Sequence, residues 1–206
     1  MSACNSFDIG QVAAVVLAAG LSRRMGTPKM LLPWGKTTVI SRVVAVLEQA
    51  GLSEIIVVTG GGRLQVEQAL QDSRARMVFN PRFTESEMIE SLQVGLAAIS
   101  GQASAALVVL GDQPQIESEV VEAVLKLYFQ EEPELVVPSY ARRRGHPWLV
   151  GRGLWPELLR MRSDQSMRDF MHAHATAITY LEVDRPSVLK DLDTPQDWER
   201  EHPPAG

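Results

Sequence analysis

The sequence predicts an α/β fold in which helices cover both faces of a mostly parallel sheet, in three layers. Short apolar runs rich in β-branched residues alternate along the chain with segments of helical periodicity. The two most apolar runs, Val12 to Ala18 and Ala105 to Leu110, carry no charge, which is typical of strands buried on both faces. With 206 residues and neither a repeat nor a linker, we expect one domain over 1–206.

The first two thirds of the chain alternate regularly between strands and helices. Ile89, Leu92, Leu96 and Ile99 recur at spacings of three and four, which predicts a helix, and Thr38 suits the N-cap of the first helix. In chain order we expect a strand over Val12–Ala18, a helix from Thr38 to Gly51, the strand Glu54–Val58, a short helix marked by Leu64, Val66 and Leu70, the strand Ala75–Phe79, a helix over Ser86–Ile99, the strand Ala105–Leu110, a helix over Val120–Phe129 and the strand Leu135–Val137.

The last third of the chain is less regular. The segment from Arg142 to Val150 contains Gly145-His146-Pro147, which favours a loop that leads into an edge strand. The elements expected after it are helices over Trp155–Arg160 and Met167–His172, a strand over Thr176–Val183 and a terminal helix that follows Asp191–Pro195.

Composition limits the class of protein. The net charge of -5 argues against a general nucleic-acid binder, because such proteins are usually basic. Cys4 is the single cysteine, which excludes an intramolecular disulfide and a cysteine-based metal cluster. No apolar run approaches the ~20 residues that cross a bilayer, and the N-terminal residues lack the pattern of a secretory signal. We therefore expect a cytoplasmic protein with neither a nucleic-acid partner nor a membrane partner.

Charged residues follow the ends of two predicted strands. The loop after Ala18 carries Gly20, Arg24 and Lys29, and Asp112 follows the most apolar strand. In an open α/β sheet, ligands bind beyond the carboxyl ends of the strands. Phosphoryl chemistry needs cations that steady the phosphates and a carboxylate that holds Mg²⁺. The pattern predicts a nucleoside triphosphate site at this edge of the sheet.

The loop matches neither of two common phosphate-binding motifs. It lacks G-x-x-x-x-G-K-[ST], and it lacks G-x-G-x-x-G, which disfavours an NAD-dependent oxidoreductase. It reads Leu-Ala-Ala-Gly-x-Ser-x-Arg-Met-Gly-x-x-Lys, and it is followed by Gly-Asp-Gln-Pro at 111–114, Arg-Gly-His-Pro at 144–147 and Asp-x-Asp-Thr-Pro-x-Asp at 191–197. With these motifs the chain resembles the nucleotidyltransferase family that includes the molybdenum cofactor cytidylyl- and guanylyltransferases. The resemblance implies a Rossmann-like fold of the nucleotide-diphospho-sugar transferase type.

The resemblance also assigns roles to residues, and it implies that Arg24, Lys29 and Asp112 are the catalytic ones. The resemblance and the positions of the strand ends predict most of the nucleotide-binding residues, and Ser91 is added because a helix would present its hydroxyl to the base. The residues expected to bind the nucleotide are Leu17, Ala18, Ala19, Gly20, Arg24, Lys29, Thr59, Ser91 and Gly111. Asp112 and Asp193 match the metal positions, although Asp193 is also a natural helix cap. Arg144 and His146 lie in a motif near the acceptor, although a solvated arginine and a hydrogen-bonded loop histidine are the alternative interpretations.

Three segments favour the cytidylyltransferase branch of the family over the guanylyltransferase branch: Ala18-Ala19-Gly20, the continuous run from Lys29 to Pro33, and Arg144 to Pro147. Two positions depart from the family pattern. Glu87 replaces a glycine and puts negative charge where a nucleotide would lie. The segment 163–168 reads Ser-Asp-Gln-Ser-Met-Arg in place of Gly-Asp-x-Gly-x-Arg.

The implied reaction is a Mg²⁺-dependent transfer of CMP from CTP, or of another nucleotide, to a molybdopterin-type phosphorylated acceptor. An acceptor phosphate oxygen attacks the α-phosphorus in line and pyrophosphate leaves, so that positioning and charge neutralisation carry the rate. A molybdoenzyme or its chaperone is the further partner that the resemblance implies. Two alternatives stay open: a guanylyltransferase or a transferase for another phosphorylated acceptor, and a non-catalytic protein that binds a nucleotide or cofactor.

Overall fold

The computed structural model describes residues 11–20, 25, 27–84 and 88–204. Within them, eight strands form one sheet in the order β10-β7-β9-β6-β1-β4-β5, and β8 pairs with β7. The strands of this sheet are β1 Val12–Ala18, β4 Glu54–Thr59, β5 Arg76–Phe79, β6 Ala105–Leu110, β7 Leu135–Tyr140, β8 Arg143–Arg144, β9 Trp148–Gly151 and β10 Ile178–Glu182. A separate hairpin pairs β2 Pro33–Trp34 with β3 Thr37–Thr38.

Strand β1 lies in the middle of the sheet. It pairs in parallel with β4 on one side, Ala18 opposite Thr59, and with β6 on the other, Leu17 opposite Leu110. All seven residues of β1 are buried. A strand with two parallel neighbours and a helix layer on each face needs an uninterrupted apolar sequence, and Val12–Ala18 supplies it. The carboxyl ends of these three strands therefore meet at one edge of the sheet.

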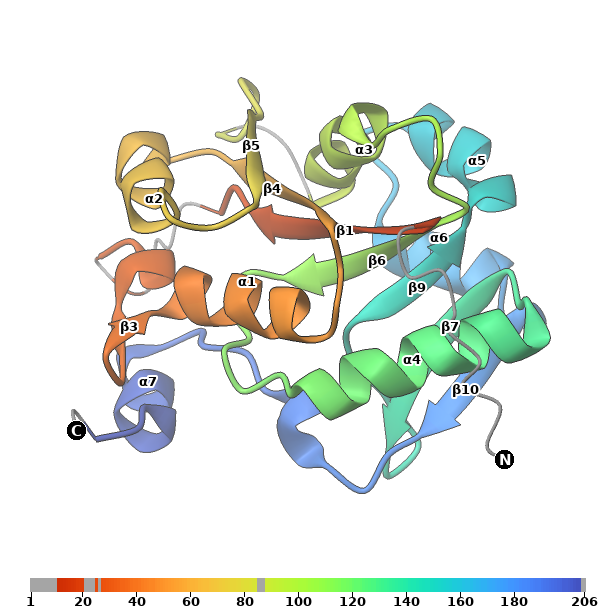
Figure 1. Cartoon of the computed structure of the whole chain (residues 1–206). Coiled ribbons are helices and arrows are strands. Elements are labelled where there is room, and N and C mark those ends of the chain that lie inside the picture. The colour runs from red at the N-terminus through yellow and green to blue at the C-terminus, as the bar shows by residue number, and fades with distance from the viewer. Residues whose placement is uncertain (1–10, 21–24, 26, 85–87, 205–206) are drawn as a thin grey trace, which may run out of the picture.

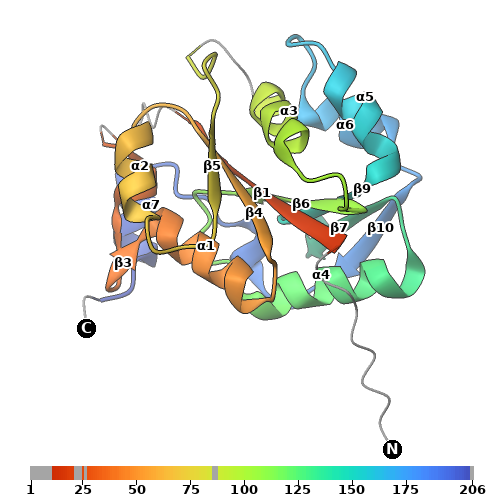
Figure 2. The ribbon, with the colours of Figure 1, turned by 45° about the horizontal axis from the view of Figure 1, so that its top comes forward.

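Helices form a layer on each face of the sheet, as Figures 1 and 2 show. One apolar cluster joins α1 Val39–Gln49, α2 Arg63–Ala69 and α4 Ser118–Glu131 to the side chains on one face of β1. A second cluster joins α3 Met88–Ala98, α5 Trp155–Arg160 and α6 Met167–Ala173 to the opposite face. The predicted three-layer α/β fold with a mostly parallel sheet is confirmed, and the elements differ from their predicted bounds by only a few residues.

One predicted element was placed wrongly, and one residue of a correctly predicted helix is exposed. Strand β9 is not at an edge, because it lies antiparallel between β6 and β7 and its residues Trp148–Val150 are buried. The glycine and proline in the preceding loop favoured an edge strand, but β9 pairs with a strand on each side. Leu64 is not part of the apolar stripe of α2: it is 75% exposed, whereas Val66 is buried. Residues two apart lie on different faces of a helix.

The chain ends in α7 Pro195–Glu201, which packs beside the β2–β3 hairpin. The Trp198 Nε1–H donates to the Pro33 carbonyl at 2.9 Å. Leu192, just before the helix, is fully buried with Trp34 and Val39 in a small apolar cluster. This packing brings a segment from the end of the sequence back to the loop that follows β1.

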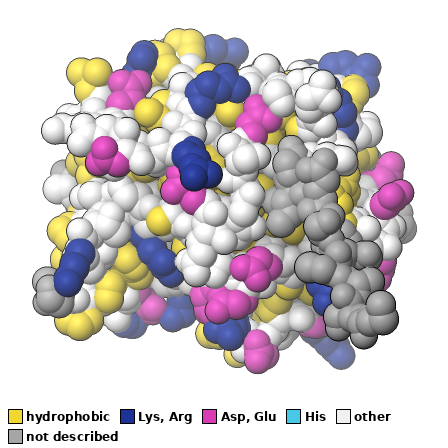
Figure 3. All heavy atoms as spheres, in the orientation of Figure 1, with side chains coloured by type: hydrophobic (Ala, Val, Ile, Leu, Met, Phe, Trp, Pro, Cys, Tyr) yellow, Lys and Arg dark blue, Asp and Glu magenta, His cyan; other side chains and the backbone are white. Residues whose placement is uncertain are grey.

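Two observations describe the surface. None of the helices that the structure describes is both long and apolar enough to cross a membrane. On the face drawn in Figure 3, Lys and Arg side chains are interspersed with Asp and Glu side chains.

We predict that Gly95→Ala destabilises the fold. Helix α3 lies so close to β1 that a Cβ at Gly95 would come within 2.3 Å of the Val15 Cγ1 and 3.0 Å of the Val58 Cγ2. Both valines are buried in the sheet, and such overpacking typically costs about 1–3 kcal/mol. Chemical denaturation measures the loss. Gly101→Ala is the control, because a Cβ there meets nothing within 4 Å. Equal stability of the two variants would contradict the close approach.

Candidate functional site

A cavity of about 550 Å³ opens at the carboxyl ends of β1 and β6. It is acidic at one end and apolar at the other. Its walls come from the end of β1 and the loop after it, the loop between β5 and α3, the first turn of α3, the end of β6 and the segment before α7. The residues that line it are Leu17, Ala19, Gly20, Lys29, Met30, Phe83, Met88, Ser91, Leu110, Asp112, Asp191 and Asp193.

The acidic end is built around one ammonium group. The Lys29 Nζ donates to the Asp112 Oδ2 and lies 3.5 Å from the Asp193 Oδ1. The side chains of Lys29 and Asp112 are each only 14% exposed, whereas that of Asp193 is 49% exposed. Asp112 and Asp193 follow Lys29 by 83 and 164 positions in the sequence, and both carboxylates meet at its ammonium.

Buried neighbours hold these charged residues in place. Lys29 begins the short 3-10 helix η2, Lys29–Leu31, whose next residue, Met30, is buried in the core beneath it. Leu192, which stands between Asp191 and Asp193 in the sequence, is buried, and its N–H donates to the Asp112 carbonyl at 3.2 Å. Because Leu192 is anchored in this way, Asp191 and Asp193 both reach the cavity wall.

The structure resolves one alternative for Asp193. The N-cap of α7 is Thr194, which forms a capping box with Asp197. Asp193 is therefore not the cap, and its carboxylate faces Lys29 instead.

Asp191 is a site residue that the sequence interpretation missed. The Gln113 Nε2–H donates to the Asp191 Oδ1. Burial raises the pKa of Asp191, and the neighbouring carboxylates of Asp112 and Asp193 raise the pKa further, against the opposing effects of Gln113 and Lys29. Its place two residues before Asp193 in the Asp-x-Asp motif was the available signal. This end of the cavity thus holds three carboxylates and the Lys29 ammonium among the residues that the structure describes.

The opposite end of the cavity is mainly apolar. Leu17 and Ala19 form one side, and Phe83, Met88 and Ser91 form another. Of these, Phe83 and Met88 were not predicted: the loop that holds Phe83 has no periodic pattern, and an apolar residue at the start of a helix, such as Met88, does not by itself mark a binding site.

Several residues predicted to bind the nucleotide lie behind the cavity wall. Ala18 is buried in β1, and Gly111 packs so closely that a Cβ there would lie 3.0 Å from the Leu17 carbonyl oxygen. Thr59 is fully buried, and its Oγ1–H donates to the Val78 carbonyl at 3.3 Å. Ala18, Thr59 and Gly111 therefore pack behind the residues that line the cavity. Arg24 and Glu87 lie outside the described residues.

The two predicted acceptor residues are placed differently from each other. Arg144 is exposed on β8, where its Nε–H donates to the Tyr180 hydroxyl at 2.9 Å. His146 stacks on Trp148 with ring centroids 4.3 Å apart, and its Nε2 is a buried nitrogen without a hydrogen-bond partner among the described residues. Burial lowers the pKa of His146 to about 4, so its imidazole is neutral at pH 7. Neither residue lines the cavity.

The acidic end fits a divalent cation that is shared with a substrate. Among the described residues, no group of three or more His, Cys, Asp or Glu side chains is arranged to hold a metal by itself. Proteins usually hold Mg²⁺ with one or two carboxylates together with phosphate oxygens of the substrate. Asp112 and Asp193 already contact the same ammonium, so a cation fits between them.

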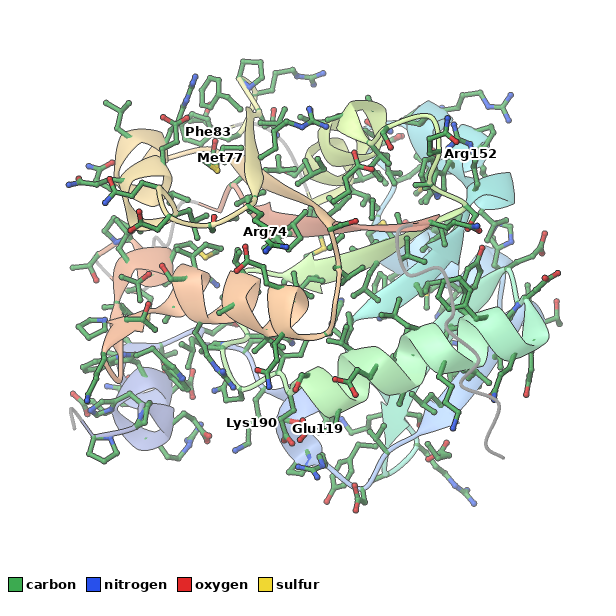
Figure 4. The ribbon with its side chains drawn as sticks, in the orientation of Figure 1. Arg74, Met77, Phe83, Glu119, Arg152 and Lys190 are labelled. Carbon is green, nitrogen blue, oxygen red and sulfur yellow. The ribbon has the colours of Figure 1, made fainter. Side chains whose placement is uncertain are left out.

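A second hollow, of about 460 Å³, lies at the amino ends of β1, β6 and β7. Its Arg152 is held by a hydrogen bond to the Ala103 carbonyl and by the ring of Trp155. Phe83 and Arg152 lie at opposite ends of the sheet in Figure 4. Because ligands of parallel sheets bind at the carboxyl ends of strands, the cavity next to Phe83 is the candidate site.

Comparison with known proteins gives a consistent family. The model of the MobA-like NTP transferase domain matches residues 14–178. The molybdenum cofactor cytidylyltransferase of Escherichia coli K12 is 27% identical over 191 residues, which cover 91% of this chain and 93% of that protein. The nicotine blue oxidoreductase of Paenarthrobacter nicotinovorans is also 27% identical, over 202 residues that cover 91% of this chain and 94% of that protein.

A solved structure agrees with this match. The crystal structure of Rv0371c from Mycobacterium tuberculosis H37Rv is 32% identical, with a TM-score of 0.81 over 93% of this chain and 97% of that chain. Rv0371c has also been solved in complex with manganese, at 31% identity and a TM-score of 0.75 over 92% of this chain and 96% of that chain. Since the family model spans most of the sequence, the chain belongs to the MobA-like NTP transferase family, a family of nucleotidyltransferase enzymes.

Proposed function

We propose that this protein is a Mg²⁺-dependent cytidylyltransferase that moves CMP from CTP to a molybdopterin-type phosphorylated acceptor and releases pyrophosphate. One observation carries the proposal: Lys29 lies between the carboxylates of Asp112 and Asp193 at the mouth of a cavity whose other end is apolar. This arrangement offers a charged end for a triphosphate and an apolar end for a base. The reaction would take place in the cytoplasm, where nucleoside triphosphates are available.

The charge balance of the acidic end supports a metal-dependent reaction. Asp112, Asp191 and Asp193 would repel a bare triphosphate, and the Lys29 ammonium alone offsets only part of that repulsion. Asp112 and Asp193 would therefore hold Mg²⁺. When bound, Mg²⁺ neutralises charge that develops on the phosphate oxygens.

Lys29 has a second task in this proposal. Its ammonium carries three donors on a flexible stem, so it can leave the carboxylates and donate to phosphate oxygens of the departing pyrophosphate. Arg24 is proposed to act with it. The acceptor phosphate is already anionic at neutral pH, so the attacking oxygen needs no strong base, and the protein contributes by holding the reacting groups in line.

Different residues are proposed to bind the base and the acceptor. For the base, Leu17, Ala19 and Gly20 line the cavity, and the segment Ala18-Ala19-Gly20 resembles the cytidylyltransferase branch. For the acceptor, Arg144 would supply positive charge. His146, being neutral at pH 7, would act only as a hydrogen-bonding or stacking group.

The similarity to a nicotine blue oxidoreductase brings a second class of reaction, hydride transfer, into consideration. The acidic site argues for nucleotidyl transfer, because hydride transfer requires neither a carboxylate pair nor a lysine between the carboxylates. A guanylyltransferase, a transferase for another phosphorylated acceptor, and a non-catalytic nucleotide-binding protein are the alternatives that the next experiment separates.

We predict that the purified protein releases pyrophosphate from CTP when Mg²⁺ and molybdopterin are present, and that GTP, ATP and UTP give much lower rates. A coupled pyrophosphate assay measures the rates. Asp112→Asn is the variant that tests the role of the carboxylate. It keeps the side chain's shape but loses the charge, and we expect its rate to fall by about 100-fold or more.

Different results would select different alternatives. Preference for GTP would replace the cytidylyl assignment with a guanylyl one. Oxidation of NADH without any pyrophosphate release would contradict nucleotidyl transfer and favour an oxidoreductase.

We predict that Lys29→Met changes two affinities in opposite directions. Loss of a charged hydrogen bond, worth about 1.5–3 kcal/mol, weakens tripolyphosphate binding by roughly 10- to 150-fold. Mn²⁺ binding to the nucleotide-free protein becomes tighter, because no ammonium competes for Asp112 and Asp193. Calorimetry measures both affinities, with Lys36→Met as an exposed control. If both affinities stay unchanged, Lys29 is an ordinary surface lysine.

A further inference from the structure

One buried polar pair joins the loop after β5 to helix α3 beside the apolar end of the cavity. Asn80 is 1% exposed and Ser91 is 6% exposed. The Asn80 Nδ2–H donates to the Ser91 Oγ at 3.1 Å. Ser91 lines the cavity together with Phe83 and Met88, whereas Asn80 lies behind it.

The orientation of the Asn80 amide is set by a second hydrogen bond. The Arg82 N–H donates to the Asn80 Oδ1 at 3.0 Å, so the amide oxygen faces Arg82 and the amide nitrogen faces Ser91. The backbone of Asn80 is also fixed, because its N–H donates to the Thr59 carbonyl at 2.9 Å and its carbonyl accepts from the Phe83 N–H at 3.3 Å. Turning the amide over would bring the Asn80 Nδ2–H groups against the Arg82 N–H, two donors facing each other.

The fixed amide decides what Ser91 can offer. A serine hydroxyl has one proton and two lone pairs. Because Asn80 donates to the Ser91 Oγ, one lone pair is used and the hydroxyl proton is left to donate elsewhere. Since Ser91 lines the cavity, its proton can be donated to a ligand there.

We propose that Asn80 is a positioning residue that holds the Ser91 hydroxyl as a hydrogen-bond donor, so that the cavity selects a nucleobase with an acceptor at that point. This inference rests on the proposed nucleotide site and specifies it further. Cytosine carries two neighbouring acceptors, O2 and N3, on one edge. The corresponding edge of guanine carries two N–H donors, N1–H and N2–H, and a single acceptor, O6, so fewer of its positions can accept from a donor hydroxyl.

Asn80→Asp tests the inference with little change of shape. The carboxylate still accepts from the Arg82 N–H, but it also accepts from Ser91, so the hydroxyl proton turns away from the cavity and a lone pair faces the base. We expect the Kd for CTP to rise about tenfold and the preference for CTP over GTP to shrink. The Kd for tripolyphosphate, which has no base, should change less than about twofold.

A double-mutant cycle separates positioning from general damage. Ser91→Ala should weaken CTP binding by about three- to tenfold, the range expected for loss of one neutral hydrogen bond. In the Ser91→Ala background, Asn80→Asp should have little further effect, because the hydroxyl through which it acts is gone. Calorimetric titration of the four proteins at pH 8 measures all of these affinities.

Two results would overturn the inference. One is an equal effect of Asn80→Asp on CTP binding with and without the Ser91 hydroxyl. The other is an equal weakening of tripolyphosphate and CTP binding, which would mean that the substitution merely disturbs the loop or adds repulsive charge. If the unmodified protein bound no nucleoside triphosphate at all, the proposed function would fail as well, which distinguishes that outcome from the first two.

Discussion

The parallel pairing of β1 with β4 and β6 is the constraint on which the rest of the site depends. Parallel strands end at the same edge of a sheet, so the loop after β1, the turn after β4 and Asp112 after β6 begin at neighbouring points. The helix layers bury β1 on both faces and leave that edge open. The cavity therefore follows from the topology before any particular side chain is considered.

Electrostatics then divides the cavity into two ends. Three carboxylates and the Lys29 ammonium lie at one end, and apolar side chains lie at the other. A nucleoside triphosphate has the same division, with a strongly charged chain of phosphates and a flat base. Lys29 holds the two carboxylates together in the nucleotide-free protein, and in the proposed function it is also the group that donates to the phosphates. The exchange between these two roles links the resting structure to the proposed chemistry.

The sequence predicts the parts of this arrangement that depend on local patterns. Uninterrupted apolar runs predict β1 and β6. The polar and glycine-containing segments that follow them mark the ends of these strands, and Lys29 and Asp112 lie in those segments. The place of β9 inside the sheet could not be read in this way, because it depends on which strands pair across long distances. Phe83 and Asn80 were missed for a related reason: their loop has no periodicity, and Asn80 before Pro81 has the appearance of an ordinary chain break. The neutral state of His146 follows from burial, which no motif reveals.

A crystal structure of the protein with CTP and Mg²⁺ tests the central claim most directly. The account predicts that the base lies against Ala19 and Gly20 with an acceptor atom near Ser91, and that the phosphates lie beside Lys29 and Asp112. A nucleotide bound in the reverse orientation, or one bound in the hollow near Arg152 at the other end of the sheet, would contradict it.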